Sequence, residues 1–242
     1  MVKASVIAAF YNNIKYLRLV LAGFEIQSEK NFELIIADDG SNDEVIREIE
    51  SISPNYSFRI KHIWHSDKGF RKNKILNQAI LASSSDYLIF IDSDCVPHSK
   101  FVEEHLNEKI NAIVLTGRRV NLSQKITELL TETKVKEGFL ESNKLLLLED
   151  ALFGKSNYVE KGFYFENNFL RKLFNKKSRG LLGCNFSLNK KDILEINGFD
   201  ERYEAPSIGE DSDIEFRLGL NGIKVKSVNQ IAVQYHLYHK LQ

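Results

Sequence analysis

The chain has 242 residues, enough to bury a sizeable core, and its 43% hydrophobic and 27% charged residues are typical of a soluble globular protein. Lysine plus arginine and aspartate plus glutamate number 33 each, so no overall field favours a nucleic-acid partner. No run approaches the roughly 18 apolar residues of a membrane span. Cys95 and Cys184 have no metal or redox spacing and, with no signal peptide, indicate a reducing compartment. We therefore expect a cytoplasmic location.

The first 120 residues alternate between strand-like and helix-like patterns. Buried-type strands are predicted at 4–10, 32–37, 60–65, 87–91 and 112–116, and helices at 14–24, 45–52 and 72–82. Alternation at this interval predicts right-handed crossovers and an α/β fold with a mostly parallel central sheet flanked by helices. The loops that follow the strands would then gather along one edge of the sheet.

The apolar run 87–91 ends abruptly in Asp92-Ser93-Asp94. Ligands of open α/β sheets bind just beyond the carboxyl ends of such strands. Two aspartates there can turn toward one point, and their oxygen atoms suit Mg²⁺ or Mn²⁺, which would in turn hold a diphosphate. The triplet alone is weak support, because aspartate and serine are also ordinary turn residues.

Three segments in order, 5–12, 35–41 and 90–94, resemble family-2 glycosyltransferases of the GT-A fold, and the resemblance covers roughly residues 1–120. It implies a UDP-sugar site in which Asp38 or Asp39 accepts a hydrogen bond from uracil, while Tyr11 offers a face to the base. A turn followed by a helix N-cap also explains residues 38–42, and the two explanations are compatible. The nucleotide-sugar-binding residues that the resemblance implies are Ala9, Tyr11, Asn12, Asp38, Asp39, Arg71, Asn77, Asp92 and Ser93.

A basic stretch, residues 68–74, comes just before the helix that precedes the aspartate triplet. Cations at a helix N-terminus can address a diphosphate, with help from the helix dipole. The Gly-Phe-Arg sequence at 69–71 resembles a bacterial subset of the family, in which Arg71 would contact the phosphates. For Lys72 and Lys74 individually, a solvated basic face is nearly as good an explanation.

Residues 119–180 are predicted to be a helical insertion between a nucleotide-sugar-binding half (1–118) and an acceptor half (181–242). Helical patterns occur at 126–139 and 145–153. Residues 158–179 interleave aromatic and basic side chains, which can lie on an anionic bilayer or hold a lipid-linked acceptor. The plainer alternative is a helical flap whose aromatic side chains pack on the body.

The acceptor half contains Gly-Cys-Asn at 183–185, Asn-Gly-Phe-Asp at 197–200 and Gly-Glu-Asp at 209–211. These motifs resemble the C-terminal region shared by β-1,4-galactosyltransferases and bacterial chondroitin-polymerase-type domains. The resemblance implies that Asp211 is the general base and that Glu210 binds the acceptor sugar. At the start of a helix the dipole stabilises ionised carboxylates, as a base requires, although a capping cluster on an exposed helix would look similar.

The tail of the chain carries His236 and His239. In the resembled families a histidine after the last strand completes the metal site, so the expected ligands are Asp92, Asp94, His239 and His236. Imidazole suits Mn²⁺ better than Mg²⁺. One departure from the families is Ala-Pro-Ser-Ile at 205–208, where a Trp-Gly pair usually forms the acceptor wall, so acceptor identity cannot be carried over.

The sequence thus predicts a single GT-A domain over 1–242 that transfers a hexose or N-acetylhexosamine, with galactose or N-acetylgalactosamine favoured, from a UDP-sugar. The expected reaction is metal-dependent and inverting, with a saccharide or lipid-linked saccharide acceptor, in bacterial surface-glycan biosynthesis at the inner membrane face. A nucleotidyltransferase is one alternative, but residues 8–13 lack the Gly-rich, Lys/Arg-bearing loop it would need after its first strand. A non-catalytic UDP-sugar- or glycan-binding module is the other.

Overall fold

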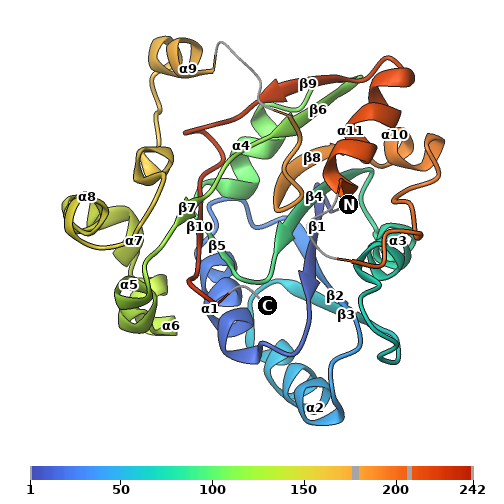
Figure 1. Ribbon diagram of the computed structural model, residues 1–242, viewed down its shortest axis with the longest axis horizontal. Coiled ribbons are helices and arrows are strands. Elements are labelled where there is room, and N and C mark those ends of the chain that lie inside the picture. Colours follow the sequence, from blue (N-terminus) through green and yellow to red (C-terminus); the bar gives the residue numbers. More distant parts are fainter. Residues whose placement is uncertain (1, 176–179, 206–208, 241–242) are drawn as a thin grey trace.

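The computed structural model describes residues 2–175, 180–205 and 209–240. Within these residues a seven-stranded sheet with the order β3-β2-β1-β4-β8-β6-β9 forms the centre of the molecule (Figure 1). Its strands are β1 (Ala4–Phe10), β2 (Phe32–Asp38), β3 (Arg59–Trp64), β4 (Tyr87–Asp92), β6 (Ile113–Thr116), β8 (Asn185–Asn189) and β9 (Lys224–Ser227). In the described sheet β8 alone is antiparallel to its neighbours, so the predicted mostly parallel sheet is confirmed.

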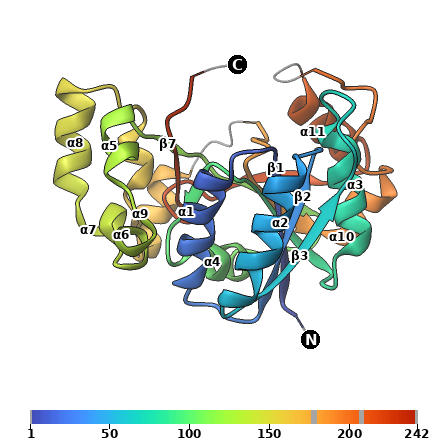
Figure 2. The same ribbon diagram turned by 90° about the horizontal axis from the view of Figure 1, so that it is seen from below.

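Helices cover both faces of this sheet (Figure 2). They are α1 (Ile14–Glu25), α2 (Asp43–Ile52), α3 (Lys72–Ala82), α4 (Phe101–Asn107), α10 (Lys190–Glu195) and α11 (Glu210–Leu220), with a 3₁₀ turn η1 (Ser53–Asn55) after α2. One apolar cluster joins the sheet to α1, α2 and α4, and a second joins it to α3, α10 and α11. Because both faces are covered, the strands are buried on both sides, as their continuous apolar runs predict.

A second, three-stranded sheet lies beside the first, in the order β5-β10-β7. It consists of β5 (Cys95–Pro97), β7 (Val120–Asn121) and β10 (Gln234–His236). The antiparallel register of β10 and β5 pairs His236 with Cys95, directly after the aspartate triplet. This pairing carries the C-terminal tail back to the end of β4.

The predicted helical insertion forms α5 (Gln124–Leu129), α6 (Glu132–Lys136), α7 (Phe139–Ser142), α8 (Lys144–Phe153), a 3₁₀ turn η2 (Val159–Gly162) and α9 (Asn168–Phe174). The prediction of one helix over 126–139 is wrong. Ser123 and Thr131 each cap a new helix through their side chains, and Gly138 takes a left-handed conformation with φ of 72°. These local preferences divide the segment into three short helices. The helix predicted at 145–153 is present as α8.

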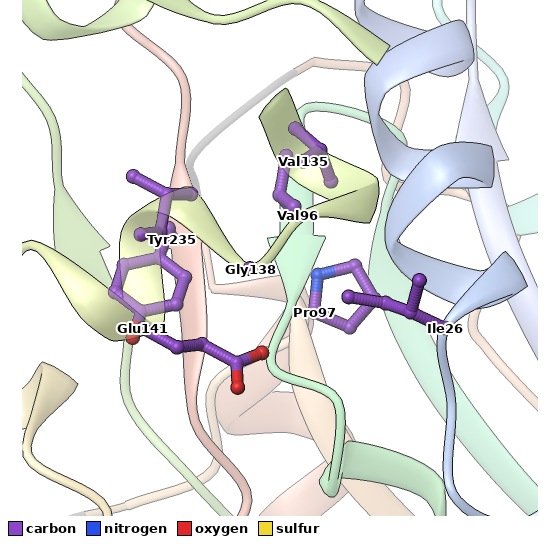
Figure 3. Close-up of a pocket in the computed structure, with 8 residues that line it drawn as sticks. Ile26, Val96, Pro97, Val135, Gly138, Glu141 and Tyr235 are labelled. Carbon is purple, nitrogen blue, oxygen red and sulfur yellow. The ribbon is translucent and has the colours of Figure 1, made fainter. Parts of the chain in front are cut away.

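The helical segment is joined to the body by polar contacts and by close packing. The Arg171 guanidinium makes two hydrogen bonds to the Glu104 carboxylate, of 2.8 and 2.5 Å, and the Tyr164 hydroxyl donates to the same group. A cavity of only about 10 Å³ separates the segment from the second sheet, between Val135 of α6 and Tyr235 of β10 (Figure 3). The segment therefore packs on the body. Just before the segment, Gly117 N–H donates to the Asn185 carbonyl at 2.9 Å.

The aromatic residues of 158–179 differ from one another in how far they are exposed to solvent. The Tyr164 ring packs against His98 with a centroid distance of 4.8 Å, whereas Phe169 is 72% exposed. Residues 176–179, which include three of the predicted basic residues, lie outside the described part of the chain. No helix in the described residues is both long enough and apolar enough to cross a bilayer.

Candidate active site

The carboxyl ends of β1, β2 and β4 meet at one edge of the large sheet. The register places Ala9 between Ala37 and Asp92, and Ser93 N–H donates to the Ala9 carbonyl at 3.0 Å. The loop after β4 is thereby fixed against the end of β1. This arrangement follows from the parallel order predicted from the sequence.

The loops after β1 and β2 are bound to each other. Asn12, at φ of 51°, donates its backbone N–H to Ser41 Oγ at 2.8 Å, and its side chain accepts from Asn42 N–H at 3.0 Å. Asn42 also caps α2 by accepting from two backbone amides. Asp38 Oδ1 accepts from Ser41 N–H, so residues 38–42 form the turn and cap that the sequence allowed.

The two aspartates of this turn differ in exposure. Asp38 is fully buried and lies 2.9 Å from His62 Nε2. Asp39 retains some exposure and lies 2.7 Å from His65 Nε2. Tyr11 is 47% exposed, with its hydroxyl bonded to Asp67 at 3.1 Å, so its ring is open to solvent. Tyr11 is thus the member of this group that is most open to a nucleotide base, and Asp39, at 8% exposed, is the less buried of the two aspartates.

Asp94, His236 and His239 form a compact cluster. Asp94 Oδ2 lies 3.3 Å from His236 Nε2 and 3.1 Å from His239 Nε2, and the two imidazole nitrogens are 3.2 Å apart. Burial opposes ionisation of Asp94, but hydrogen bonds from the two histidines outweigh it and hold the pKa of the carboxyl well below its usual range. The cluster is the one possible metal group of at least three His, Cys, Asp or Glu side chains among the described residues. One carboxylate with two imidazoles fits Mn²⁺ better than Mg²⁺.

Asp92, which was also predicted as a metal ligand, is not part of this cluster. Its Oδ1 lies 3.2 Å from Lys72 Nζ, and its Oδ2 lies 4.0 Å from the Arg119 guanidinium. Lys72 Nζ lies 3.5 Å from Glu210 Oε1 as well. The ammonium therefore joins the end of β4 to the start of α11, and this contact brings the two halves of the predicted site together.

Glu210 and Asp211 begin α11 directly after Gly209, which takes a left-handed conformation. Asp211 Oδ2 accepts a 2.7 Å hydrogen bond from Gly183 N–H, while Glu210 Oε2 is buried without a partner among the described residues. Burial, the largest influence on each, raises the pKa of both carboxyls. Burial therefore acts against the stabilisation expected from the helix dipole, and the raised pKa makes each group a stronger proton acceptor. We call Asp92, Asp94, Glu210 and Asp211 the site carboxylates.

Two predicted nucleotide-binding residues have other contacts. The Asn77 amide donates to the Phe199 carbonyl at 2.9 Å and accepts from Phe199 N–H at 2.8 Å, so it holds the Asn-Gly-Phe-Asp loop. Arg71 donates its backbone N–H to Asp39 at 2.8 Å and its guanidinium to the Ser66 carbonyl. Its Nε is buried without a described partner. Binding of nucleotide by either residue stays a prediction.

Sequence reasoning missed two cations of the site. Lys72 belonged to the basic stretch 68–74 but was not distinguished there from Lys74, which is exposed. Arg119 lies where the resemblance fades, and no pattern marked it. The thiols of Cys95 and Cys184, distant in the sequence, meet beneath the site, where Cys95 Sγ donates to Asp94 at 3.3 Å. Only the folded chain brings these groups together.

Comparison with known proteins agrees with this geometry. The profile described as Glycosyl transferase family 2 matches residues 5–176, well over half of the chain. The chain belongs to glycosyl transferase family 2. A second profile, described as the N-terminal domain of galactosyltransferase, matches residues 167–240 and includes the start of α11. The predicted family is therefore confirmed, and this chain is a glycosyltransferase domain.

Two curated relatives match nearly the whole of this family 2 chain. The glycosyltransferase YfnE of Bacillus subtilis is 26% identical over 262 residues, covering 98% of this chain and 65% of the relative. The hyaluronan synthase of Pasteurella multocida is 23% identical over 248 residues, covering 96% of this chain and 24% of the synthase. The chain thus spans less than two thirds of either relative.

Two solved structures share the fold. S. aureus TarS 1–349 in complex with UDP-GlcNAc has a TM-score of 0.62 at 16% identity, covering 99% of this chain and 60% of that one. The mannosyltransferase PcManGT from Pyrobaculum calidifontis, in complex with GDP-Man and Mn²⁺, has a TM-score of 0.61 at 13% identity, covering 98% and 57%. The predicted fold is confirmed by these likenesses.

Proposed function

We propose that the chain transfers a hexose or N-acetylhexosamine, with galactose or N-acetylgalactosamine favoured, from a UDP-sugar to a saccharide hydroxyl with inversion at the sugar carbon. The observation that carries the proposal is the Lys72 ammonium, which lies between Asp92 of the nucleotide half and Glu210 of the acceptor half. A donor held after β4 and an acceptor held at the start of α11 would therefore be neighbours. In this proposal residues 1–118, 119–180 and 181–242 act as one GT-A domain.

Asp211 is the proposed general base. Transfer with inversion needs a carboxylate that accepts the proton of the attacking hydroxyl. Gly183 N–H fixes one oxygen of Asp211, and the raised pKa of this carboxyl favours proton acceptance by the group. Glu210 would hold the acceptor sugar, because its buried and unpartnered Oε2 can accept a hydrogen bond from a sugar hydroxyl.

Asp94, His236 and His239 are the proposed ligands of a divalent cation, with Mn²⁺ preferred over Mg²⁺. Beside this cluster, the three carboxyl groups of Asp92, Glu210 and Asp211 have two cations near them in the described residues, Lys72 and Arg119. This imbalance supports a requirement for a divalent cation. Such an ion, when bound, would stabilise the charge of the departing diphosphate.

The nucleotide would lie over the ends of β1 and β2, with Asp39 the better-exposed partner for uracil and Tyr11 stacked on the base. TarS binds UDP-GlcNAc and UDP, and PcManGT binds GDP-Man, which supports a nucleotide-sugar donor for this chain. The alternative of a nucleotidyltransferase is disfavoured because residues 8–13 lack a phosphate-cradling glycine loop. A non-catalytic UDP-sugar- or glycan-binding module would not explain the half-buried Asp211 carboxylate with its raised pKa.

We further propose a role in bacterial surface-glycan biosynthesis at the cytoplasmic face of a membrane, with a saccharide or lipid-linked saccharide as acceptor. Contact with the membrane would use 158–179, where Phe169 is 72% exposed. Sedimentation with anionic and with neutral vesicles tests this. Binding to anionic vesicles that the Phe169→Ser variant loses supports the contact, and equal behaviour of the two proteins contradicts it.

The experiment that tests the activity uses the purified chain with a panel of UDP-sugars, Mn²⁺ and saccharide acceptors. We expect at least one UDP-sugar to raise the melting temperature in the presence of Mn²⁺, because a ligand that binds only the folded state stabilises it. We also expect UDP release that stops when EDTA is added. No binding and no UDP release with any donor would contradict the assignment. Activity that EDTA leaves unchanged would contradict the metal requirement alone.

A further inference from the structure

Lys72 is the first residue of α3, and its ammonium lies among the site carboxylates. The atom is 3.2 Å from Asp92 Oδ1 and 3.5 Å from Glu210 Oε1, and the side chain is only 22% exposed. Burial lowers the pKa of the ammonium, but nearby carboxylates, Asp92 foremost, outweigh this effect and raise it above the usual lysine range. The side chain therefore stays charged at every physiological pH.

The orientation of Glu210 depends on this one contact. Lys72 is the sole cation within 4 Å of the Glu210 carboxylate in the described part of the chain. Gly209, which precedes Glu210, has no side chain that could bond to this carboxylate. With Oε1 on the ammonium, the other oxygen, Oε2, is left buried and unpartnered. Lys72 thus determines which oxygen of Glu210 remains free.

The contact of Lys72 with Asp92 makes its contact with Glu210 important. Asp92 ends β4 in the nucleotide half, whereas Glu210 begins a helix of the acceptor half, and two carboxylates at such short range repel each other without a shared cation. An ammonium that pairs with both fixes their separation. Reacting groups gain rate from such fixed geometry, and a misplacement of about 1 Å can cost on the order of a hundredfold.

We propose that Lys72 is a positioning residue that aligns the acceptor-binding carboxylate Glu210 with the donor-binding end of β4. This alignment affects how much of the donor sugar is transferred to the saccharide acceptor and how much is lost to hydrolysis by water. The inference rests on the proposed function but assigns Lys72 no contact with the donor phosphates. It therefore differs from the diphosphate-binding role that a basic stretch at a helix start would suggest.

The test compares Lys72→Gln and Lys72→Arg with Lys74→Gln, a matched control because Lys74 is exposed on the same first turn of α3. With the donor and acceptor found active for the wild type, we expect Lys72→Gln to lower kcat/KM for the acceptor by about tenfold to a hundredfold and to raise the ratio of hydrolysis to transfer. UDP affinity measured by calorimetry with Mn²⁺ should stay within about threefold of wild type. Lys72→Arg should recover most of the transfer, and Lys74→Gln should match wild type.

Three outcomes would contradict the proposal. A Lys72→Gln variant that binds UDP at least about tenfold more weakly while binding uridine normally would make Lys72 a phosphate ligand instead. If Lys72→Gln transfers sugar as fast as the wild type, Lys72 has no role in the reaction. A wild type without transfer activity would defeat the proposed function, and amide hydrogen exchange then decides the inference separately. Exchange at 209–214 should be faster in Lys72→Gln than in Lys74→Gln, and equal exchange would contradict the coupling of Lys72 to α11.

Discussion

The backbone N–H of Gly183 donates a 2.7 Å hydrogen bond to Oδ2 of Asp211, across the boundary between the strand that returns to the sheet and the helix that carries the proposed base. A Cβ atom at Gly183 would lie 2.3 Å from the other carboxylate oxygen, Oδ1. This separation is far below any real contact. Any larger residue at 183 would therefore have to displace the Asp211 carboxylate.

Gly183→Ala should displace the Asp211 carboxylate and lower transfer by about tenfold to a hundredfold, since small misplacements of reacting groups are costly. UDP affinity should be unchanged. Gly219→Ala is the control, because a Cβ there meets nothing and an alanine in a helix adds about 0.5–1 kcal/mol of stability. Steady-state kinetics with calorimetry checks both variants. Wild-type kinetics in Gly183→Ala would show that the carboxylate position does not matter.

Asp211→Asn should remove the proposed base and reduce kcat by about a hundredfold to ten-thousandfold, while UDP binding is retained. Glu210→Gln should instead raise KM for the acceptor, because the amide alters the hydrogen bonds available to a sugar hydroxyl. The two variants are measured with the same donor and acceptor. A protein that only binds glycans would show no turnover to lose, and an unimpaired Asp211→Asn would move the base elsewhere.

Asp94→Asn and His239→Gln should each weaken Mn²⁺ binding by about tenfold or more, because each removes one donor of a three-residue cluster. Titration calorimetry with Mn²⁺ alone measures this effect without any assay of activity. Asp86→Asn is the matched control, since Asp86 is exposed and precedes β4. Retention of full Mn²⁺ affinity in both variants would contradict the assigned ligands.

His105 should make the protein acid-sensitive. Its ring is fully buried, with Nδ1 2.8 Å from Ser187 Oγ, and burial lowers the pKa of the imidazole to about 3. The unfolded chain binds the proton near pH 6.5, before the folded chain can, so stability is lost as the pH falls below that value. Between pH 7.5 and pH 5 the loss from this group is about 2 kcal/mol. Urea unfolding at both pH values should show a smaller loss in His105→Gln, and an equal loss in both proteins would contradict this.

Arg171→Met should destabilise the protein strongly. Glu104 is 3% exposed, and the variant leaves its carboxylate with no guanidinium partner at that site. Breaking a buried pair from one side costs about 3–5 kcal/mol. Lys172→Met, at the exposed next position, should change the unfolding free energy by less than about 0.5 kcal/mol. Chemical denaturation compares them, and similar midpoints would show that the contact between α9 and α4 contributes little.

The sequence predicts the nucleotide half well, because its strands are continuous apolar runs and its turns contain residues that act locally. Asn42 shows this: it caps α2 as its residue type suggests, three residues after Asp39. Asp94 was predicted as a metal ligand from local sequence too, because it follows closely after the apolar run 87–91, and this role stays a prediction. The order of the parallel strands then places Ala9 beside Asp92 without further information.

The remaining features of the site depend on contacts between distant segments. Lys72 and Lys74 are alike in the sequence, and only the position of α11 distinguishes the bridging lysine from the exposed one. The partial burial of Glu210 and Asp211 depends on distant segments such as the Gly183 turn, so an argument from the helix start alone did not include it. The division of 124–142 into three helices was missed because the apolar periodicity continues across Thr131, which begins a new helix, and across Gly138.

The 2.9 Å bond from Gly117 to the Asn185 carbonyl draws together the two points at which the helical segment leaves and rejoins the sheet. The two ends of the intervening stretch therefore lie next to each other. Its length can change without moving β6 and β8, the strands that flank it. Replacing it with the corresponding stretch of a relative would therefore place a new surface on an unaltered central sheet.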